Sequence, residues 1–380
     1  MIYLDNAATT KPYEEILTEA LTYVNEHYYN PSSVYLPAFE VKKVLQAKKQ
    51  QLAKLLGASY DEIIFTSGAT ESNNLFLQGV VTSNKKEEYI FSLGEHSSVY
   101  EVANFIKGKG YTVHFAKLLK TGQVDLEHLL SLVNENTRLV SVMHVSNETG
   151  AVNDIKLITS AVKQKNKNTL VHSDGVQAFC KLSVNVKNLG VDAYTISGHK
   201  IHAVKGVGAL FIKSGVFVRA TIFGGGQEDN RRSGTENVLG IMSLVNSAQK
   251  MHENRELNYE NALSLKTEFK KQLASLEGVV VHVEDNISSP YILSLSILGI
   301  KSEILVHMLA KYGVLISTGS SCSSNSKYSG NRTLEAMGKT KEEVMGSVRI
   351  SFSQFNTLDE VKLASELFIK LVNELRSKIA

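Results

Sequence analysis

Short β-rich segments alternate with amphipathic helical segments between residues 61 and 212, and this alternation constrains the fold more than any other feature. It is typical of βαβ units, which form a mostly parallel sheet covered by helices on both faces. The predicted strands are 62–65, 88–92, 111–115, 138–145, 170–174, 193–197 and 208–212. The predicted helices between several of them are 99–109, 126–133 and 155–164. We therefore expect an α/β protein built on a mostly parallel seven-stranded sheet.

The pattern changes after about residue 251, where the regular alternation ends. A predicted helix at about 259–276 is followed by strands 279–283 and 291–297, a helix 302–312, a strand 347–352 and a final helix from 358. The stretch 318–331 is rich in Ser, Gly and Asn, includes Cys322 and is predicted to be a mobile loop. This α+β layout predicts a second, smaller domain.

The composition argues against several classes of function. Acidic and basic residues are interspersed and the formal net charge is only +3, so direct binding of nucleic acid is not expected. No apolar run is long enough to span a bilayer, and the N-terminus lacks the features of a signal peptide. The two cysteines lie far apart, and no His/Cys group has the spacing of a zinc site. These features predict a cytoplasmic protein without a metal site, whose thiols stay reduced.

Ligands of parallel sheets bind at the carboxyl ends of the strands, so the polar residues that follow the predicted strands are the candidates for a site. The motif TSGATESNN follows the first strand. Its residues Gly68, Ala69 and Thr70 leave backbone N–H groups open at a helix start, which favours phosphate. A simple helix cap by Ser67 or Thr70 explains the same residues, and is the better explanation of this motif alone.

Two further strands are followed by polar residues. Asp174 ends one of them and can pair with a cationic ring nitrogen, and Gln177 can contact a neighbouring ring hydroxyl group. An Asp-Gly turn explains this motif equally well. Lys200 follows the next strand and can form a Schiff base with an aldehyde cofactor, whose phosphate Ser197 and His199 can contact. On position alone, a solvated surface charge is the more common role of a lysine.

His96, Asn147 and Arg349 complete the candidates. His96 can stack on a flat ring and move protons, or be a purely structural histidine. Asn147 and Arg349 can bind a carboxylate, while a surface ion pair is the usual alternative for an arginine. A phosphate turn, an acid for a ring nitrogen, a Schiff-base lysine and a stacking histidine are together what pyridoxal 5′-phosphate (PLP) needs.

The motifs also occur in the order and spacing of one enzyme group. They are YLDNAATT, NPSS, TSGATESNN, NETG, SDGVQA, SGHK, KGVGAL, GGGQE with RRSGTEN, and GSSCSS. From Ile2 to the final helix, the sequence resembles the NifS/IscS-like cysteine desulfurases, a class-V aminotransferase group of the fold-type I PLP-dependent transferases. The resemblance implies a large PLP-binding domain at 14–253. It implies a smaller α+β domain formed by 1–13 and 254–380, which carries the cysteine loop at about 318–331.

The resemblance implies roles for the candidate residues. Lys200 would form the Schiff base with PLP, and His96 would stack on its ring. The other residues implied to contact PLP are Asp174 at the ring nitrogen, Gln177 at the ring hydroxyl, and Ala69, Thr70, Ser197 and His199 at the phosphate, joined by Thr235 of the partner subunit in a homodimer. Asn147 and Arg349 would bind the carboxylate of L-cysteine. Cys322 would attack the substrate sulfur, which leaves a persulfide on Cys322 and releases L-alanine.

The same resemblance bears on partners and alternatives. A selenocysteine lyase or a plain class-V aminotransferase shares the fold, but a plain aminotransferase has no use for Cys322. The sulfur would pass to an acceptor protein, either the iron–sulfur scaffold or a tRNA-thiolation or thiazole-synthesis protein. Because the chain ends at Ala380, directly after its last helix, we expect one of the dedicated acceptors rather than the scaffold.

The sequence departs from the group at a few positions. Ala203 and Val204 stand where the group usually has Gly-Pro, and Tyr35 and Ala38 stand where it commonly has His and Gly. These changes are expected to affect local loop shape rather than the core chemistry. Cys180, close to Gln177, is expected to be a buried, unreactive thiol.

Overall fold

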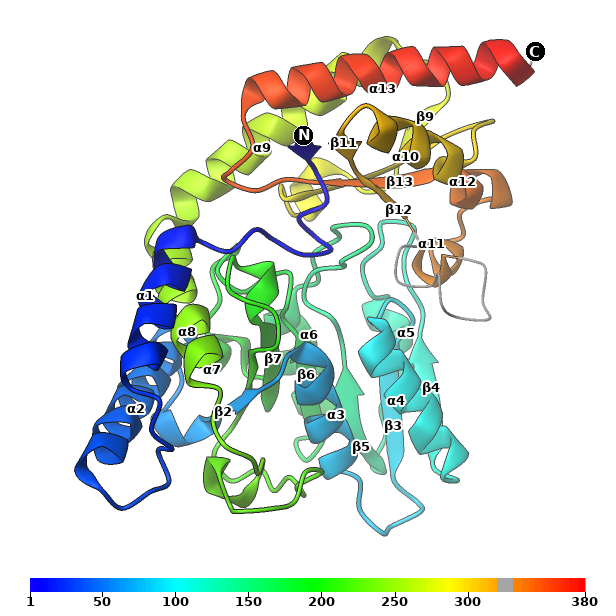
Figure 1. The fold of residues 1–380 in the computed structure, drawn as a ribbon. Helices are drawn as coiled ribbons and strands as arrows, with labels where there is room; N and C mark the ends of the chain where they lie inside the picture. The colour runs from blue at the N-terminus through cyan, green and yellow to red at the C-terminus, as the bar shows by residue number, and fades with distance from the viewer. Residues whose placement is uncertain (320–330, 380) are drawn as a thin grey trace.

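The largest sheet in the computed structural model contains all the strands predicted between residues 61 and 212 (Figure 1). The structure describes residues 1–319 and 331–379. Within these residues, the strands of the larger sheet lie in the order β2-β8-β7-β6-β5-β3-β4. They are β2 (Ile63–Thr66), β3 (Glu88–Ser92), β4 (Thr112–Ala116), β5 (Thr137–Ser141), β6 (Leu170–Asp174), β7 (Ala193–Ser197) and β8 (Gly208–Ile212). Only β8 runs antiparallel to its neighbours in this described sheet, so the predicted mostly parallel seven-stranded sheet is confirmed.

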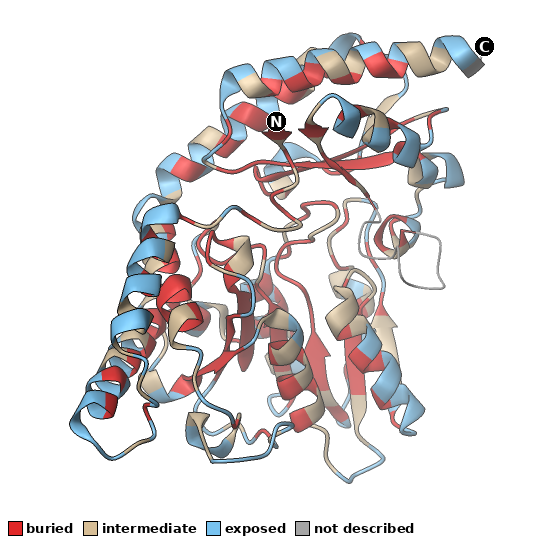
Figure 2. Cartoon of the chain, viewed as in Figure 1, coloured by how far each residue is buried: buried red, intermediate tan, exposed pale blue. Residues whose placement is uncertain are grey.

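Helices cover both faces of this sheet because successive residues of each strand point to opposite sides and are apolar on both. In β2, Ile63 packs into one hydrophobic core and Ile64 into the other. The Ile64 side is covered by α3 (Ala69–Gly79) and α4 (Ser97–Gly108). The other side is covered by α2 (Leu36–Leu56), α6 (Ile155–Lys165), α7 (Val186–Leu189) and α8 (Val238–Glu253). Two further helices pack on these: α1 (Glu14–Glu26) on α8, and α5 (Leu126–Leu132) on α6. Figure 2 shows most strands of this sheet buried, the edge strand β4 partly exposed, and the outer faces of α1 and α2 exposed.

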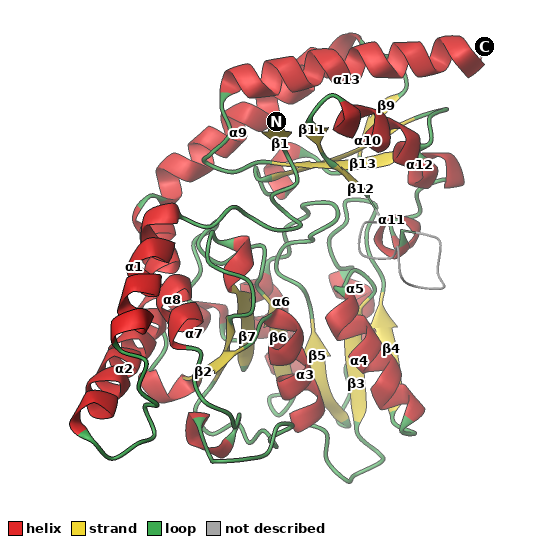
Figure 3. Cartoon of the chain, viewed as in Figure 1, coloured by secondary structure: helices red, strands yellow, loops and turns green. Residues whose placement is uncertain are grey.

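A smaller antiparallel sheet follows, in the order β12-β13-β10-β9 (Figure 3). Its strands are β9 (Val279–Val281), β10 (Ile292–Ile297), β12 (Ser317–Thr318) and β13 (Ser347–Ser351). It has its own core with α9 (Arg255–Gln272), α10 (Ser302–Lys311) and α13 (Leu358–Ile379), and the short helices α11 (Arg332–Ala336) and α12 (Lys341–Met345) lie beside it. Even α13, with 22 residues, is not apolar enough to cross a membrane, and neither is any other described helix.

The first residues of the chain belong beside the smaller sheet, although they precede the larger one in sequence. β1 (Ile2–Tyr3) pairs in parallel with β11 (Val314–Leu315), and Asp5 forms an isolated bridge with Ser351 of β13. The chain then passes to α1 and enters the larger part of the fold. This route carries residues 7–9 along the boundary between the two sheets.

Some predicted strands are too long, and the one at 138–145 exceeds the observed strand by the most. The apolar run 138–145 predicts eight residues of strand, but β5 ends at Ser141. Beyond it the contact with β6 continues, since His144 N–H donates to the Asp174 carbonyl oxygen at 3.0 Å, whereas Met143 N–H donates to a side-chain atom, Glu95 Oε1, at 2.8 Å. The chain thus loses its pairing with β3 after Ser141 but stays beside the carboxyl end of β6.

Candidate active site

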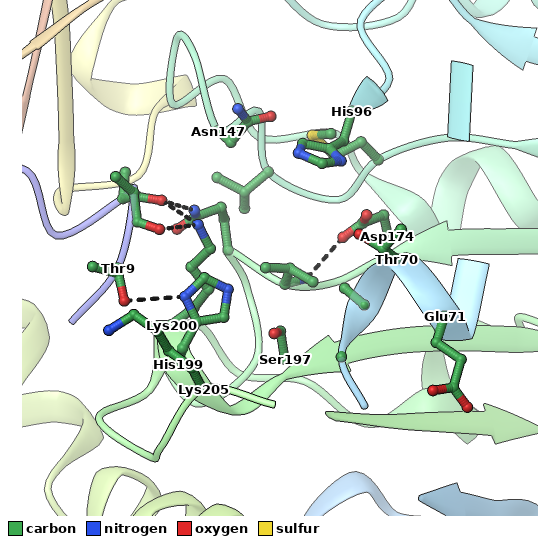
Figure 4. Close-up of a pocket in the computed structure, with 18 of the residues that line it drawn as sticks. Thr9, Thr70, Glu71, His96, Asn147, Asp174, Ser197, His199, Lys200 and Lys205 are labelled. Atoms are coloured by element: carbon green, nitrogen blue, oxygen red, sulfur yellow. Dashed lines mark hydrogen bonds between the residues drawn. The ribbon is translucent and has the colours of Figure 1, made fainter. Parts of the chain in front are cut away.

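A cavity of about 510 Å³ lies where the parallel strands β3, β5, β6 and β7 end (Figure 4). Residues 7–9 and Arg349 of β13 also line it, so both sheets contribute. The predicted site residues that line this cavity are Ala69, Thr70, His96, Asn147, Asp174, Gln177, Ser197, His199, Lys200 and Arg349. Residues far apart in the sequence therefore meet at one place, as the rule for the carboxyl ends of parallel strands requires.

Asp174 is the last residue of β6 and is held by two hydrogen-bond donors. Asn73 Nδ2 donates to its Oδ2 at 2.9 Å, and the backbone N–H of Val176 donates to its Oδ1 at 3.1 Å. Both bonds stabilise the ionised carboxylate. The next residue must be glycine, because a Cβ on Gly175 would lie 2.0 Å from the ring of Tyr194.

The predicted phosphate turn lies at the start of α3, close to the ends of β7 and β8. A Cβ on Gly208 would lie 2.7 Å from the Cα of Gly68, so only glycine lets β8 approach this turn. Ser197 and His199 line the cavity beside it. Burial and then the nearby Lys200 lower the pKa of His199 to about 4, so its imidazole is neutral near pH 7. The N–H groups of the first helical turn have no partner within the helix and can bind an anion.

Lys200 ends a short 3-10 helix that follows β7. Its Nζ donates to the carbonyl oxygens of Ala7 and Ala8 at 2.7 and 2.6 Å. Gln177 Nε2 donates to the same Ala7 carbonyl at 3.0 Å, and Lys181 Nζ donates to Gln177 Oε1 at 2.9 Å. The N-terminal segment and Lys181 are thus parts of the site that sequence reasoning missed. The motif YLDNAATT was a signal for the segment, whereas nothing local distinguishes Lys181 from a surface lysine.

Arg349 is 2% exposed, and its guanidinium is oriented by two partners. Nη1 donates to the Asn147 carbonyl oxygen and Nη2 to Asp5 Oδ1, each at 2.8 Å. Its Nε is buried and has no hydrogen-bond partner among the described residues. An unpaired N–H group of a buried guanidinium suits a carboxylate ligand, since such a group is costly to leave unsatisfied.

Known proteins resemble this chain over nearly its whole length. The family model Aminotransferase class-V matches residues 2–363. A cysteine desulfurase of Trichormus azollae is 35% identical, with 99% of this chain and 94% of that protein aligned. The chain belongs to the cysteine desulfurase group of the class-V aminotransferase family. A solved NifS-like protein superposes with a TM-score of 0.92 at 34% identity, covering 98% of this chain and 99% of its own. A second solved structure, SspA in complex with cysteine, superposes with a TM-score of 0.83 at 26% identity, covering 94% and 100%.

PLP is the cofactor of this family, and the residues present fit it. The cavity offers an ionised carboxylate fixed by two donors, the amine of Lys200, and a helix N-terminus for a phosphate. No group of three or more His, Cys, Asp or Glu side chains in the described residues could hold a metal ion. The chemistry of the donors therefore matches a cofactor with a ring nitrogen, an aldehyde and a phosphate.

The main cavity does not test the roles predicted for Thr235 and Cys322. Thr235 does not line the main cavity but a neighbouring one of about 250 Å³, which shares Ser67 and Gly206 with it. Its predicted role concerns a second copy of the chain and stays a prediction. Cys322 falls outside the described residues, so its predicted role also stays a prediction.

The residues just after 320–330 are held to the rest of the protein by hydrogen bonds and a cation–π contact. Asn331 Nδ2 donates to the Gly319 carbonyl oxygen at 2.7 Å. Arg332 Nε donates to the Leu93 carbonyl oxygen at 3.2 Å, and its guanidinium lies 3.7 Å from the centre of the Tyr100 ring. Arg332 thus fixes the start of α11 to the segments on either side of His96, a contact that sequence reasoning missed.

One of the departures from the group has a local structural reason. Val204, which stands where the group has proline, donates its backbone N–H to Ser243 Oγ at 3.1 Å, a bond that proline cannot make. Cys180 has a φ of 61° although it is not glycine, and its thiol donates to the Ala248 carbonyl oxygen at 3.5 Å. Burial raises the pKa of the Cys180 thiol, which keeps it protonated and unreactive.

Proposed function

We propose that this chain converts L-cysteine to L-alanine with PLP and transfers the sulfur to its own Cys322. The convergence of Lys200, Asp174 and Arg349 on one cavity carries this proposal. An amine, a fixed carboxylate and a guanidinium with a free N–H group are what an enzyme needs to hold PLP and an amino acid side by side. The names of the relatives point to the same activity.

Each residue of the chain has a distinct task in this proposal. When bound, PLP withdraws electrons from the amino acid attached to it, which makes cleavage of bonds at its carbon atoms possible. Lys200 would hold PLP through its amine, and the Asp174 carboxylate would accept a hydrogen bond from the ring nitrogen. The remaining residues that would hold it are His96 at the ring, Gln177 at the ring hydroxyl, and Ala69, Thr70, Ser197 and His199 at the phosphate.

The substrate would be oriented by its carboxylate. Arg349 Nε is available for that group because Nη1 and Nη2 already contact Asn147 and Asp5. A guanidinium held in this way loses little side-chain entropy when it binds an anion. Asn147 would add a hydrogen bond from its side-chain amide.

The sulfur step is balanced without an external oxidant. The thiolate of Cys322 would attack the sulfur of the bound cysteine, so that an S–S bond forms while the C–S bond breaks. The substrate carbon would gain a proton and leave as L-alanine, and Cys322 would keep the sulfur as a persulfide. Lys200 Nζ and His96 are the cavity groups that can hold or move that proton.

Several finer features belong to the same proposal. We propose that residues 14–253 form the PLP-binding domain, and that 1–13 with 254–380 form the smaller domain that carries the cysteine loop. The separate hydrophobic cores of the two sheets support this division. Thr235 of the partner subunit would complete the phosphate site in a homodimer. The persulfide would pass to an acceptor protein, such as a tRNA-thiolation enzyme or an iron–sulfur scaffold, in a reducing compartment such as the cytoplasm.

The test measures both reaction products in the native protein and in variants of its two cysteines. Purified protein with PLP should form equal amounts of L-alanine and sulfide from L-cysteine in the presence of a thiol reductant. Cys322→Ser should abolish both products while leaving the absorbance of bound PLP in place, and Lys200→Ala should remove that absorbance. Cys180→Gly, which suits the φ of 61°, is the matched control and should keep full activity.

Two outcomes of this test would count against the proposal. Sulfide formation that survives Cys322→Ser would exclude the persulfide step. A much higher rate with L-selenocysteine than with L-cysteine would point instead to a selenocysteine lyase.

A further inference from the structure

A chain of hydrogen bonds links Asp174 to His96 through Asn73, which holds Asp174, and through Ser98, which has no role so far. Asn73 Nδ2 donates both to Asp174 Oδ2 and to Ser98 Oγ, each at 2.9 Å. Ser98 Oγ lies 2.9 Å from His96 Nδ1, and the backbone N–H of Ser98 donates to the same nitrogen at 3.1 Å. Asn73 is fully buried and Asp174 is 4% exposed, so solvent hardly competes for these bonds.

The direction of every bond follows from the donors and acceptors available. An ionised carboxylate can only accept, so Asn73 must turn its NH₂ group toward Asp174. The second hydrogen of that group points at Ser98 Oγ, which accepts it and therefore directs its own hydrogen to His96 Nδ1. Because the backbone N–H of Ser98 points there as well, Nδ1 accepts two hydrogen bonds and carries no proton. The proton of the neutral imidazole must then be on Nε2.

We propose that Asn73 and Ser98 are positioning residues that hold His96 as the Nε2–H tautomer and tie its state to the charge of Asp174. The inference rests on the proposed function and deepens it, since it assigns two more residues to the same site. An imidazole held in this way offers an N–H group at Nε2 to whatever it faces. Its Nδ1 cannot take up a proton unless both hydrogen bonds to it break.

The charged neighbours of His96 also affect its pKa. Burial lowers the pKa of His96, Asp174 opposes this effect, and Lys200 and Arg332 add to it. These neighbours come from β6, the turn after β7 and α11, and none of them donates to Nδ1. The hydrogen bonds from Ser98 are thus separate from these charges, and a variant of Ser98 can be interpreted without changing any of them.

The experiment is ¹⁵N NMR of histidine-labelled holoenzyme, with the His96 signals assigned by their loss in His96→Gln. In the native protein near neutral pH, Nδ1 should show the shift of an unprotonated nitrogen and Nε2 that of a protonated one. Ser98→Ala removes one of the two donors to Nδ1, so the pH at which His96 becomes doubly protonated should rise by about one unit, a tenfold gain in proton affinity. Asn73→Leu frees the Ser98 hydroxyl to turn away from His96. This variant should also raise the pH at which His96 becomes doubly protonated.

Two variants guard against a merely structural explanation. Ser98→Thr keeps the hydroxyl group and should leave the His96 titration as in the native protein. Ser97→Ala, one residue earlier in α4, is the matched control and should also leave it unchanged. We expect Ser98→Ala to lower kcat/KM for L-cysteine about tenfold, with restoration in Ser98→Thr.

The inference is overturned if native His96 carries its proton on Nδ1, or if Ser98→Ala leaves both ¹⁵N shifts and the titration unchanged. The NMR signals are present whether or not L-cysteine is a substrate. Failure of the proposed function, seen as native protein that does not desulfurate cysteine, is therefore distinguishable from failure of this inference.

Discussion

Lys181 is a buried amine beside the site whose charge costs the protein stability. It is 4% exposed, donates to Gln177 Oε1 and makes no ion pair among the described residues. Burial, and then the nearby charge of Lys200, lower the pKa of Lys181 from 10.5 to about 7. We predict that this single group gives the protein a stability that rises with pH above neutrality, and that Lys181→Met removes the effect.

The sign and size follow from proton linkage. Between the folded pKa of about 7 and the unfolded value of 10.5, the unfolded chain binds a proton at Lys181 that the folded chain has lost. The free energy of unfolding therefore rises with pH in this window, by about 1.4 kcal/mol per pH unit. Below the folded pKa both states are protonated, and the slope from this group vanishes. A chain of this length unfolds with an entropy of about 0.8 kcal/mol/K, so the slope equals about 1.7 °C in Tm per pH unit.

The assay is thermal melting of the apoenzyme between about pH 7.5 and about pH 9.5. The difference in Tm between the native protein and Lys181→Met should change by about 3 °C across this range, in favour of the native protein at the higher pH. Lys187→Met, a change at an exposed lysine of α7, is the matched control and should show no such trend. A constant difference for Lys181→Met would mean that the buried amine is not neutralised in this window, and would refute the reasoning.

Three further predictions concern single side chains. Arg349→Lys should raise KM for L-cysteine at least about tenfold, because the compact ammonium of lysine lacks the planar fork that reaches Asn147 and Asp5 and leaves Nε for a ligand, and steady-state kinetics will measure this. Gly208→Ala should destabilise the protein by about 1–3 kcal/mol and weaken PLP binding, since its Cβ would lie 2.7 Å from Gly68 Cα. Gly108→Ala, where a Cβ meets nothing within 4 Å, is its control in melting and cofactor titration. Arg332→Ala should lower kcat without removing bound PLP, and an unchanged kcat would show that the attachment of α11 is dispensable.

The larger sheet and part of the site could be predicted because both depend on local patterns. β3, β6, β7 and β8 begin and end where the apolar runs do, since each run is bounded by residues unsuited to a strand. Parallel strands place their carboxyl ends at one edge, so Asp174, Ser197 and Lys200 were expected to meet. α2 was not assigned, although its buried residues Val41, Leu45, Leu52 and Leu56 follow a helical period.

The remaining parts of the site depend on contacts between distant segments. Lys200 reaches Ala7 across 193 positions of the chain, and Asn73 reaches Asp174 across 101. No local pattern encodes such a partner, because the contact exists only after both sheets have packed. Lys181 shows the same limit: its sequence neighbourhood resembles that of a surface lysine, and only tertiary packing buries it.

The reversed direction of β8 has a consequence for how freely the chain can change in length. β7 ends and β8 begins at the same edge of the sheet, with Ser197 paired to Gly208. Both ends of the connection that carries Lys200 are thereby pinned at the cavity. Ala203 and Val204, which stand where the resemblance leads us to expect Gly-Pro, lie in this connection. An insertion or deletion there would displace the Lys200 amine itself, so we expect the number of residues between β7 and β8 to vary far less than their identities.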